Sequence, residues 1–218
     1  MRKTALVAGG TGLIGRQLIE LLCRDDDFGS VLHVGRRSCG INHPKLREYL
    51  GSDLSGVALN ASDMEAAFCC LGTTMARAGS KEAFYAVDHN LCLTFGELAK
   101  RHRAKALIMV SSLGADPGSG NYYLRVKGET ERDLAALGFV RFVAVRPSLL
   151  LGPRSESRPG ERLGQVLMSA LNPLFLGPLK RYKAITGVQV AQAMLNLTRQ
   201  DATGVRMIEN EVMLELAG

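Results

Sequence analysis

Hydrophobic and polar positions divide the chain into short apolar runs and longer segments that are apolar along one face. The runs end in glycine or small polar residues, as buried parallel strands do, and they cover Ala5–Ala8, Val31–Gly35, Leu46–Leu50, Ala66–Leu71, Lys105–Ser112, Val140–Val145 and Gly204–Glu209. Apolar residues at helical spacing predict helices that begin at Leu13 and span about Lys81–His102, Tyr122–Leu137 and Gly187–Arg199. This alternation over short connections predicts an α/β fold with a doubly wound parallel sheet of Rossmann type.

The length of 218 residues allows one α/β domain with a substantial core, so we expect a single domain over residues 1–218. Hydrophobic residues make up 46% and charged residues 22% of the chain, a composition that excludes a disordered protein. Residues 153–185 break the regular pattern, because Pro159, Pro173 and Pro178 interrupt any helix there. We expect this segment to form a small lid over the substrate.

Targeting signals and metal motifs are missing from the pattern. No apolar run reaches the roughly 18–20 residues of a membrane span. Residues 1–4 lead into the first predicted strand without the apolar core of a signal peptide, which favours a cytoplasmic protein. The five cysteines form no Cys-x-x-Cys pair and the four histidines are scattered, which favours reduced thiols and no metal site.

Three glycines follow the first predicted strand and open the first predicted helix. A pyrophosphate binds the free N–H groups and positive dipole end of such a helix, where side chains would obstruct it. Gly9 allows the tight turn, Gly12 removes a Cβ from the phosphate path, and Gly15 lets the helix lie close to the sheet. We predict dinucleotide contacts from Gly9, Thr11, Gly12, Leu13, Ile14 and Gly15. A tight turn with a purely structural role is the alternative.

The end of the second predicted strand bears on the choice of cofactor. NAD-binding folds commonly place a carboxylate there to accept from the ribose 2′-hydroxyl, whereas this chain has Arg36 and Arg37. A guanidinium can hold a 2′-phosphate through charge-assisted hydrogen bonds, so NADP(H) is favoured over NAD(H), with Arg36 the first candidate and a pair of solvated surface arginines the alternative.

Small residues also end the run at Ala66–Leu71. They let a dinucleotide lie across the carboxyl end of a parallel strand, which makes Leu71, Gly72 and Thr73 candidates to border it. A plain turn at the end of the strand is the alternative.

Tyr123 and Lys127 are four residues apart at the start of a predicted helix, so their side chains lie on one face. A phenol with an ordinary pKa of about 10 is a poor acid or base at neutral pH. A lysine cation beside it stabilises the phenolate, and a serine hydroxyl can bind the substrate oxygen. Ser111 and Ser112 end the strand upstream, so the three groups can converge where a nicotinamide would end. A tyrosine and a lysine exposed on a helix surface are the alternative.

These motifs resemble the short-chain dehydrogenase/reductase superfamily over nearly the whole chain. They are Gly9–Gly15, Ser111–Ser112, Tyr123 with Lys127, and Arg146–Pro147. More narrowly, Cys69–Thr74, Gly114–Asp116 and Val126–Glu129 are similar to the atypical subgroup that contains the HIV Tat-interacting protein. The resemblance implies a Rossmann fold, NADP(H) binding and a Ser/Tyr/Lys triad that reduces a carbonyl or oxidises an alcohol.

The resemblance also suggests residue roles. Tyr123 would donate the proton, Lys127 would tune Tyr123 and hold the nicotinamide ribose, and Ser112 would polarise the oxygen, with Ser111 as the other candidate serine. Related enzymes imply that Asp53 binds the adenine amino group, although a helix N-cap is equally open. Contacts on the nicotinamide side would come from Pro147, Ser148 and Leu149. Asp88 replaces the asparagine that many of these enzymes carry, which puts in doubt a proton relay through that amide.

The net charge of +6 comes from basic residues spread along the chain, so an anionic small ligand explains it better than nucleic acid, and no nucleic-acid partner is expected. Two interpretations remain open. One is an NADP(H)-dependent oxidoreductase; the other is a regulatory protein that senses the dinucleotide and binds a protein partner with little turnover. The sequence identifies neither the substrate nor the oligomeric state.

Overall fold

The computed structural model describes residues 2–61, 63–151 and 181–218. Its centre is a sheet of parallel strands in the order β3-β2-β1-β4-β5-β6-β9. The strands are β1 (Lys3–Ala8), β2 (Phe28–Gly35), β3 (Leu46–Leu50), β4 (Ala66–Cys69), β5 (Ala106–Val110), β6 (Arg141–Arg146) and β9 (Gly204–Glu209). The order reverses between β1 and β4, the arrangement of a doubly wound fold, and the predicted fold class is confirmed.

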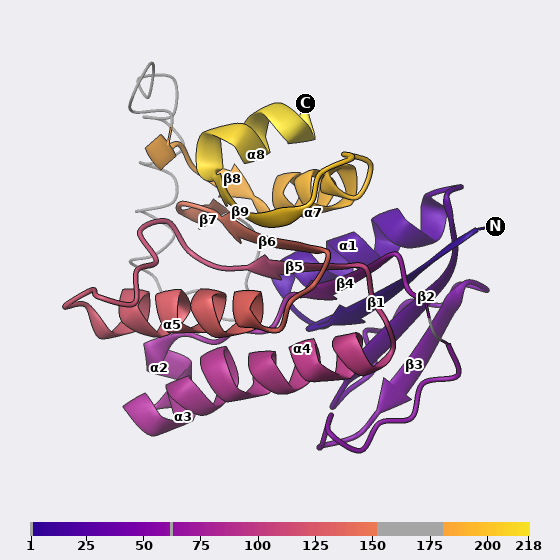
Figure 1. Ribbon diagram of the computed structural model, residues 1–218, viewed down its shortest axis with the longest axis horizontal. Helices are drawn as coiled ribbons and strands as arrows, with labels where there is room; N and C mark the ends of the chain where they lie inside the picture. The colour runs from indigo at the N-terminus through magenta and orange to yellow at the C-terminus, as the bar shows by residue number, and fades with distance from the viewer. Residues whose placement is uncertain (1, 62, 152–180) are drawn as a thin grey trace.

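Helices cover both faces of the sheet (Figure 1). On one face lie α1 (Leu13–Arg24), α7 (Gly187–Leu197) and α8 (Asn210–Ala217), whose buried apolar residues share one core cluster. On the other face α4 (Cys92–Arg101) and α5 (Tyr122–Ala136) pack over a second cluster. The central strands β1, β4 and β5 are buried on both faces, which explains why they are apolar runs rather than alternating patterns.

Several predicted boundaries were wrong by a few residues. β2 begins at Phe28 rather than Val31, β4 ends at Cys69 rather than Leu71, and β5 stops at Val110, before the two serines. At β4 and β5 the cause is the same, because apolar or small residues continue beyond the last paired residue of the strand into the loop that follows it. β3 and β9 have the predicted bounds.

The long helix predicted over Lys81–His102 is wrong in its middle. The segment is divided into α3 (Lys81–Tyr85), a π-helical segment η1 (Ala86–Leu91) and α4. The short helix α2 (Met75–Ala78), the pair β7 (Leu150–Leu151) and β8 (Ile185–Thr186), and helix α8 were not predicted. Most of the predicted lid lies outside the described residues.

All five cysteines are free thiols, as the sequence favoured. Four of them are buried, and burial raises the pKa of Cys23 to about 11. In the described parts of the chain, none of the helices combines the length and apolar character that crossing a bilayer requires.

Candidate active site

The glycine turn lies between β1 and α1 and packs against the end of β4. Gly9 has a φ of +86°, which glycine adopts without strain. A Cβ on Gly9 would collide with the carbonyl of Cys70, and one on Gly15 would collide with the carbonyl of Gly9. Gly12 is the N-cap of α1 and supplies no capping side chain. The first N–H groups of α1 are therefore left for a ligand.

Other predicted residues of this turn divide between surface and core. Thr11 and Gly12 are exposed, whereas Ile14 and Gly15 are buried. Leu13 is half-buried and lies against Gly187, the first residue of α7. Contacts of Leu13 and Ile14 with a dinucleotide would therefore come from their backbone rather than from their side chains.

A buried ion pair lies beyond the end of β4. The Nζ of Lys127 on α5 is 2.7 Å from Oδ1 of Asp88 in η1, and these side chains are 5% and 0% exposed. The backbone N–H of Thr73 donates to the other carboxylate oxygen of Asp88 at 2.8 Å. A Cβ on Gly72 would lie 3.3 Å from Oδ1 of Asp88 and 3.5 Å from the Lys127 Nζ, so the loop after β4 packs closely over the ion pair.

Burial by itself would lower the pKa of Lys127, but attraction to Asp88 outweighs it, and Tyr123 adds to that attraction, so the pKa of Lys127 is raised. The amine is therefore held as a cation near the phenol. In the sequence Asp88 stood out only as a departure from the usual asparagine, and its pairing with Lys127 was not predicted. The π-helical segment that carries Asp88 has no signal in the sequence, although such segments occur often at functional sites.

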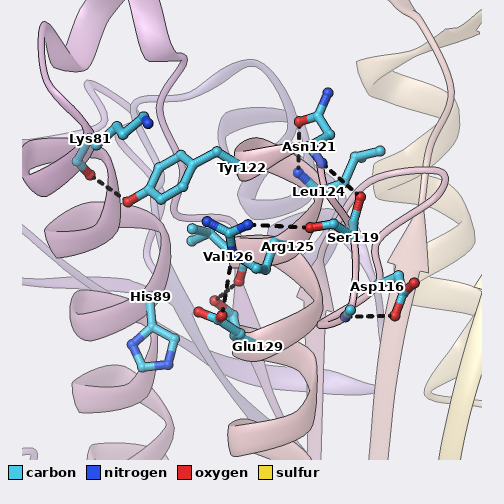
Figure 2. A network of polar contacts seen from close by, with 12 residues as sticks. Lys81, His89, Asp116, Ser119, Asn121, Tyr122, Leu124, Arg125, Val126 and Glu129 are labelled. Carbon is cyan, nitrogen blue, oxygen red and sulfur yellow. Dashed lines mark hydrogen bonds and ion pairs between the residues drawn. The ribbon is translucent and has the colours of Figure 1, made fainter.

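The two tyrosines that open α5 have different surroundings. Figure 2 shows Tyr122 pointing toward Lys81, whose carbonyl accepts a hydrogen bond from the Tyr122 hydroxyl at 2.9 Å. Tyr123 is half-buried, packs on Phe84 with 5.5 Å between ring centroids, and lies on the face of Lys127. The helix register thus agrees with the expectation that Tyr123, not Tyr122, is the partner of Lys127.

The start of α5 is fixed by local hydrogen bonds. The side chain of Asn121 caps the helix by accepting from the N–H of Leu124, and Arg125 donates to the carbonyl of Ser119 at 3.4 Å (Figure 2). A Cβ on Gly128 would collide with the backbone of Asp116, so the helix packs directly on the loop before it. These contacts fix the first turn of α5, which carries Tyr123, against the loop that follows β5.

The two candidate serines follow β5 and differ in exposure. Ser111 is 4% exposed, and its hydroxyl has no hydrogen-bond partner among the described residues. Ser112 is half-buried, and its hydroxyl makes only a 3.5 Å contact with the carbonyl of Leu113. The Ser112 hydroxyl is therefore the more available of the two to a substrate.

On the opposite side of the glycine turn, Arg36 and Arg37 are exposed directly after β2. Neither guanidinium pairs with any residue in the described ranges. Asp53 is exposed too, and both of its carboxylate oxygens accept from Ser55, at 2.8 and 2.6 Å. It closes a turn rather than capping a helix, so the predicted N-cap alternative was wrong.

The candidates on the nicotinamide side follow β6. Pro147 is buried and its carbonyl accepts from the N–H of Leu113, which ties this loop to the loop after Ser112. The Ser148 hydroxyl donates to the carbonyl of Lys183 at 2.5 Å, so it holds the neighbouring chain segment, and Leu149 is 42% exposed. Leu71 and Thr73 are half-buried and Gly72 is exposed, at the edge of the Asp88–Lys127 pair.

A second group of charged residues, around Arg146, was not predicted from the sequence. Arg146 pairs with Glu131 at 2.6 Å and with Glu209 at 3.1 Å, joining β6 to α5 and β9. Beside it is a cavity of about 270 Å³ whose described lining is Leu113, Gly114, Arg146, Arg181, Glu209 and Glu211. The cavity begins at the residue after Ser112, on the same edge of the sheet as the candidate residues Tyr123 and Lys127.

Comparison with protein families gives a match over most of the chain. The profile of the NAD dependent epimerase/dehydratase family matches residues 5–189. Protein HTATIP2 of Rattus norvegicus is 33% identical, over 98% of this chain and 89% of the rat protein. The mitochondrial protein FMP52-1 of Scheffersomyces stipitis is 30% identical, over 98% of each chain.

Solved structures with the same fold are more distant in sequence. An oxidoreductase of the short chain dehydrogenase/reductase family from Burkholderia thailandensis has a TM-score of 0.72 at 19% identity, covering 99% of this chain and 94% of that one. A UDP-N-acetylglucosamine 4-epimerase from Methanobrevibacter ruminantium has a TM-score of 0.68 at 20% identity, covering 95% and 76%. At these identities the likeness extends to the fold alone.

Proposed function

Because this chain belongs to the NAD dependent epimerase/dehydratase family, in its atypical short-chain dehydrogenase/reductase branch, we propose that it is an NADP(H)-dependent oxidoreductase. The reaction is hydride transfer between the nicotinamide and the carbonyl or alcohol carbon of a small molecule. The observation that carries the proposal is the buried Asp88–Lys127 pair on the Tyr123 face of α5. A buried lysine cation beside a phenol is an arrangement that can tune an acid–base group.

In the proposed reaction Tyr123 gives its hydroxyl proton to the substrate oxygen. The Lys127 cation stabilises the phenolate that results. Lys127 is itself held by Asp88, whose carboxylate balances its charge where solvent is excluded. Ser112 hydrogen-bonds the substrate oxygen, and Ser111 lies on the cofactor side. The charged cavity next to Ser112 suits a substrate with a polar end, since its described lining offers both guanidinium and carboxylate groups.

The proposed dinucleotide site runs across the carboxyl edge of the sheet. The first turn of α1 binds the pyrophosphate, Leu71, Gly72 and Thr73 border it, and the exposed Arg36 binds the 2′-phosphate of NADP(H). When bound, the cofactor supplies or accepts the hydride. Both guanidinium groups at positions 36 and 37 project from the strand end without partners among the described residues, which supports a role in binding an anion.

The test is a matched pair of tyrosine variants. Tyr123→Phe should lower NADPH consumption against a panel of carbonyl compounds by about 100-fold or more while leaving NADPH affinity unchanged, because it removes only the transferable proton. Tyr122→Phe, which loses only the bond to the Lys81 carbonyl, should keep turnover. Unchanged turnover in Tyr123→Phe would overturn the proposed role of the phenol.

A second function is a dinucleotide sensor that binds a protein partner. Asp88 favours it, because a carboxylate cannot donate a proton to a relay as an amide or water chain does. This alternative predicts tight NADPH binding by the wild type with no consumption across the panel. Neither function depends on a particular cellular compartment, and we propose that this chain is cytoplasmic.

A further inference from the structure

His33 is a buried histidine in β2 that the proposed reaction does not use. It is 1% exposed, and its ring lies between two glycines. A Cβ on Gly10 would lie 2.7 Å from the ring, and a Cβ on Gly35 would lie 3.1 Å from its Nε2. Gly10 is not part of the 9, 12, 15 spacing, and Gly35 directly precedes Arg36. The ring thus joins the start of the pyrophosphate turn to the strand end that carries the proposed 2′-phosphate site.

The hydrogen bonds of the ring fix its protonation. The backbone N–H of Gly10 donates to Nε2 at 3.2 Å, so Nε2 carries no proton in this arrangement. Nδ1 lies 2.9 Å from Oε1 of Glu48 on β3 and must be the donor to that carboxylate. A second proton, at Nε2, would remove the acceptor of the Gly10 N–H and set two donors against each other.

Glu48 extends the connection to the loop after β2. Its Oε1 also accepts from the N–H of Cys39 at 2.8 Å, and its Oε2 accepts from the Ser38 hydroxyl at 2.6 Å. Burial would raise the pKa of Glu48, but the hydrogen bonds from Ser38 and Cys39 outweigh it and lower the pKa to about 2. The carboxylate is therefore charged throughout the neutral range and anchors both His33 and the residues that follow Arg37.

We propose that His33 and Glu48 are positioning residues of the dinucleotide site, acting as one clamp on the turn at Gly10 and on the loop that carries Arg36 and Arg37. The inference rests on the proposed dinucleotide binding but not on turnover. Through Nε2, His33 holds the Gly10 N–H and keeps the turn open for the pyrophosphate.

The surroundings of the ring support a clamp rather than another role. Among the described residues, the titratable groups that face it are the carboxylate of Glu48 and the thiol of Cys39, whose pKa is raised by burial, so the thiol stays neutral. Gly10 and Ile19 complete the contacts from the turn and from α1. His33, Cys39 and Glu48 place three ligand-type atoms within 4.8 Å, but both ring nitrogens and both carboxylate oxygens already have protein partners. The geometry therefore favours the clamp over a metal site.

The experiment compares His33→Gln with His33→Leu. Glutamine offers an oxygen to the Gly10 N–H and an N–H to Glu48, whereas leucine offers neither. NADPH and NADH dissociation constants are measured by calorimetry at pH 8. His33→Gln is the matched control, because it keeps both hydrogen bonds without the imidazole ring.

His33→Leu should bind either dinucleotide about tenfold more weakly than the wild type, the equivalent of one lost hydrogen bond, whereas His33→Gln should bind nearly as the wild type does. Equal affinities of the wild type and His33→Leu would overturn the clamp, and so would an equal loss in His33→Gln and His33→Leu. If His33→Leu does not fold, nitrogen NMR of the ring decides: a proton on Nδ1 alone at pH 8 supports the clamp, and one on Nε2 overturns it.

The clamp and the proposed function fail in different ways. NADPH binding that depends on His33 with no turnover of any substrate would overturn the reaction and leave the clamp standing. Turnover with dinucleotide binding that is indifferent to substitution of His33 would do the reverse.

Discussion

Two polar clusters flank the dinucleotide edge of the sheet and differ in how their charge is held. On the α5 side, Asp88 and Lys127 form an ion pair with side chains at most 5% exposed. On the β3 side, a buried imidazole faces a Glu48 side chain that is 21% exposed. The first cluster holds a lysine cation against a carboxylate, whereas the second joins an imidazole, neutral in this arrangement, to a carboxylate through a hydrogen bond. We propose the first for acid–base chemistry and the second for positioning the dinucleotide.

The largest expected effect comes from breaking the Asp88–Lys127 ion pair. Asp88→Leu should lower the free energy of unfolding by about 3–5 kcal/mol, because it leaves the Lys127 ammonium buried without a counter-charge. The double variant Asp88→Leu with Lys127→Met should recover much of that loss, since apolar groups can replace both charges. Urea unfolding of the two proteins measures the difference. A single variant as stable as the wild type would mean that Lys127 is not held by Asp88.

The next-largest effect concerns the affinity for the dinucleotide. Arg36→Ala should weaken NADPH binding by about tenfold or more and leave NADH binding nearly unchanged, because only NADPH offers a 2′-phosphate to the guanidinium. Arg37→Ala is the matched control and should have the smaller effect. Calorimetric titration with both dinucleotides reads the result. Equal losses for NADPH and NADH would remove the 2′-phosphate assignment.

The smallest effect concerns the acid stability of the β3 side. The pKa of Glu48 is about 2 in the folded protein and 4.5 ordinarily, so its stabilising contribution is present above pH 4.5 and is lost as the pH falls toward 2. Glu48→Gln should therefore lose less stability than the wild type between pH 4.5 and pH 2. Thermal unfolding midpoints across that window measure it, with Glu97→Gln at an exposed position of α4 as the control. Parallel curves for Glu48→Gln and the wild type would contradict the assignment.

Family membership and the main line of the fold could be predicted because they depend on local patterns. The glycine spacing, the buried strands and the Tyr123–Lys127 spacing each involve residues within a few positions of one another. Even the choice of Tyr123 over Tyr122 followed from which tyrosine has a basic residue four positions later. Backbone sterics and helix periodicity act over that range, so the sequence carried the information directly.

The partners of the buried polar groups could not be predicted in the same way. Asp88 meets Lys127 only because η1 interrupts the long helix beside α5, and His33 meets Gly10 across two strands. Arg146 likewise pairs with Glu131 on α5 and Glu209 on β9, which the fold brings next to it from separate elements. By itself the sequence determined the strands of the main sheet to within a few residues, the glycine turn and the Tyr123–Lys127 spacing. Only the tertiary structure decided which charged groups are buried against one another. The reason is that the free-energy cost of burying a polar group depends on the distant residue that the fold places against it.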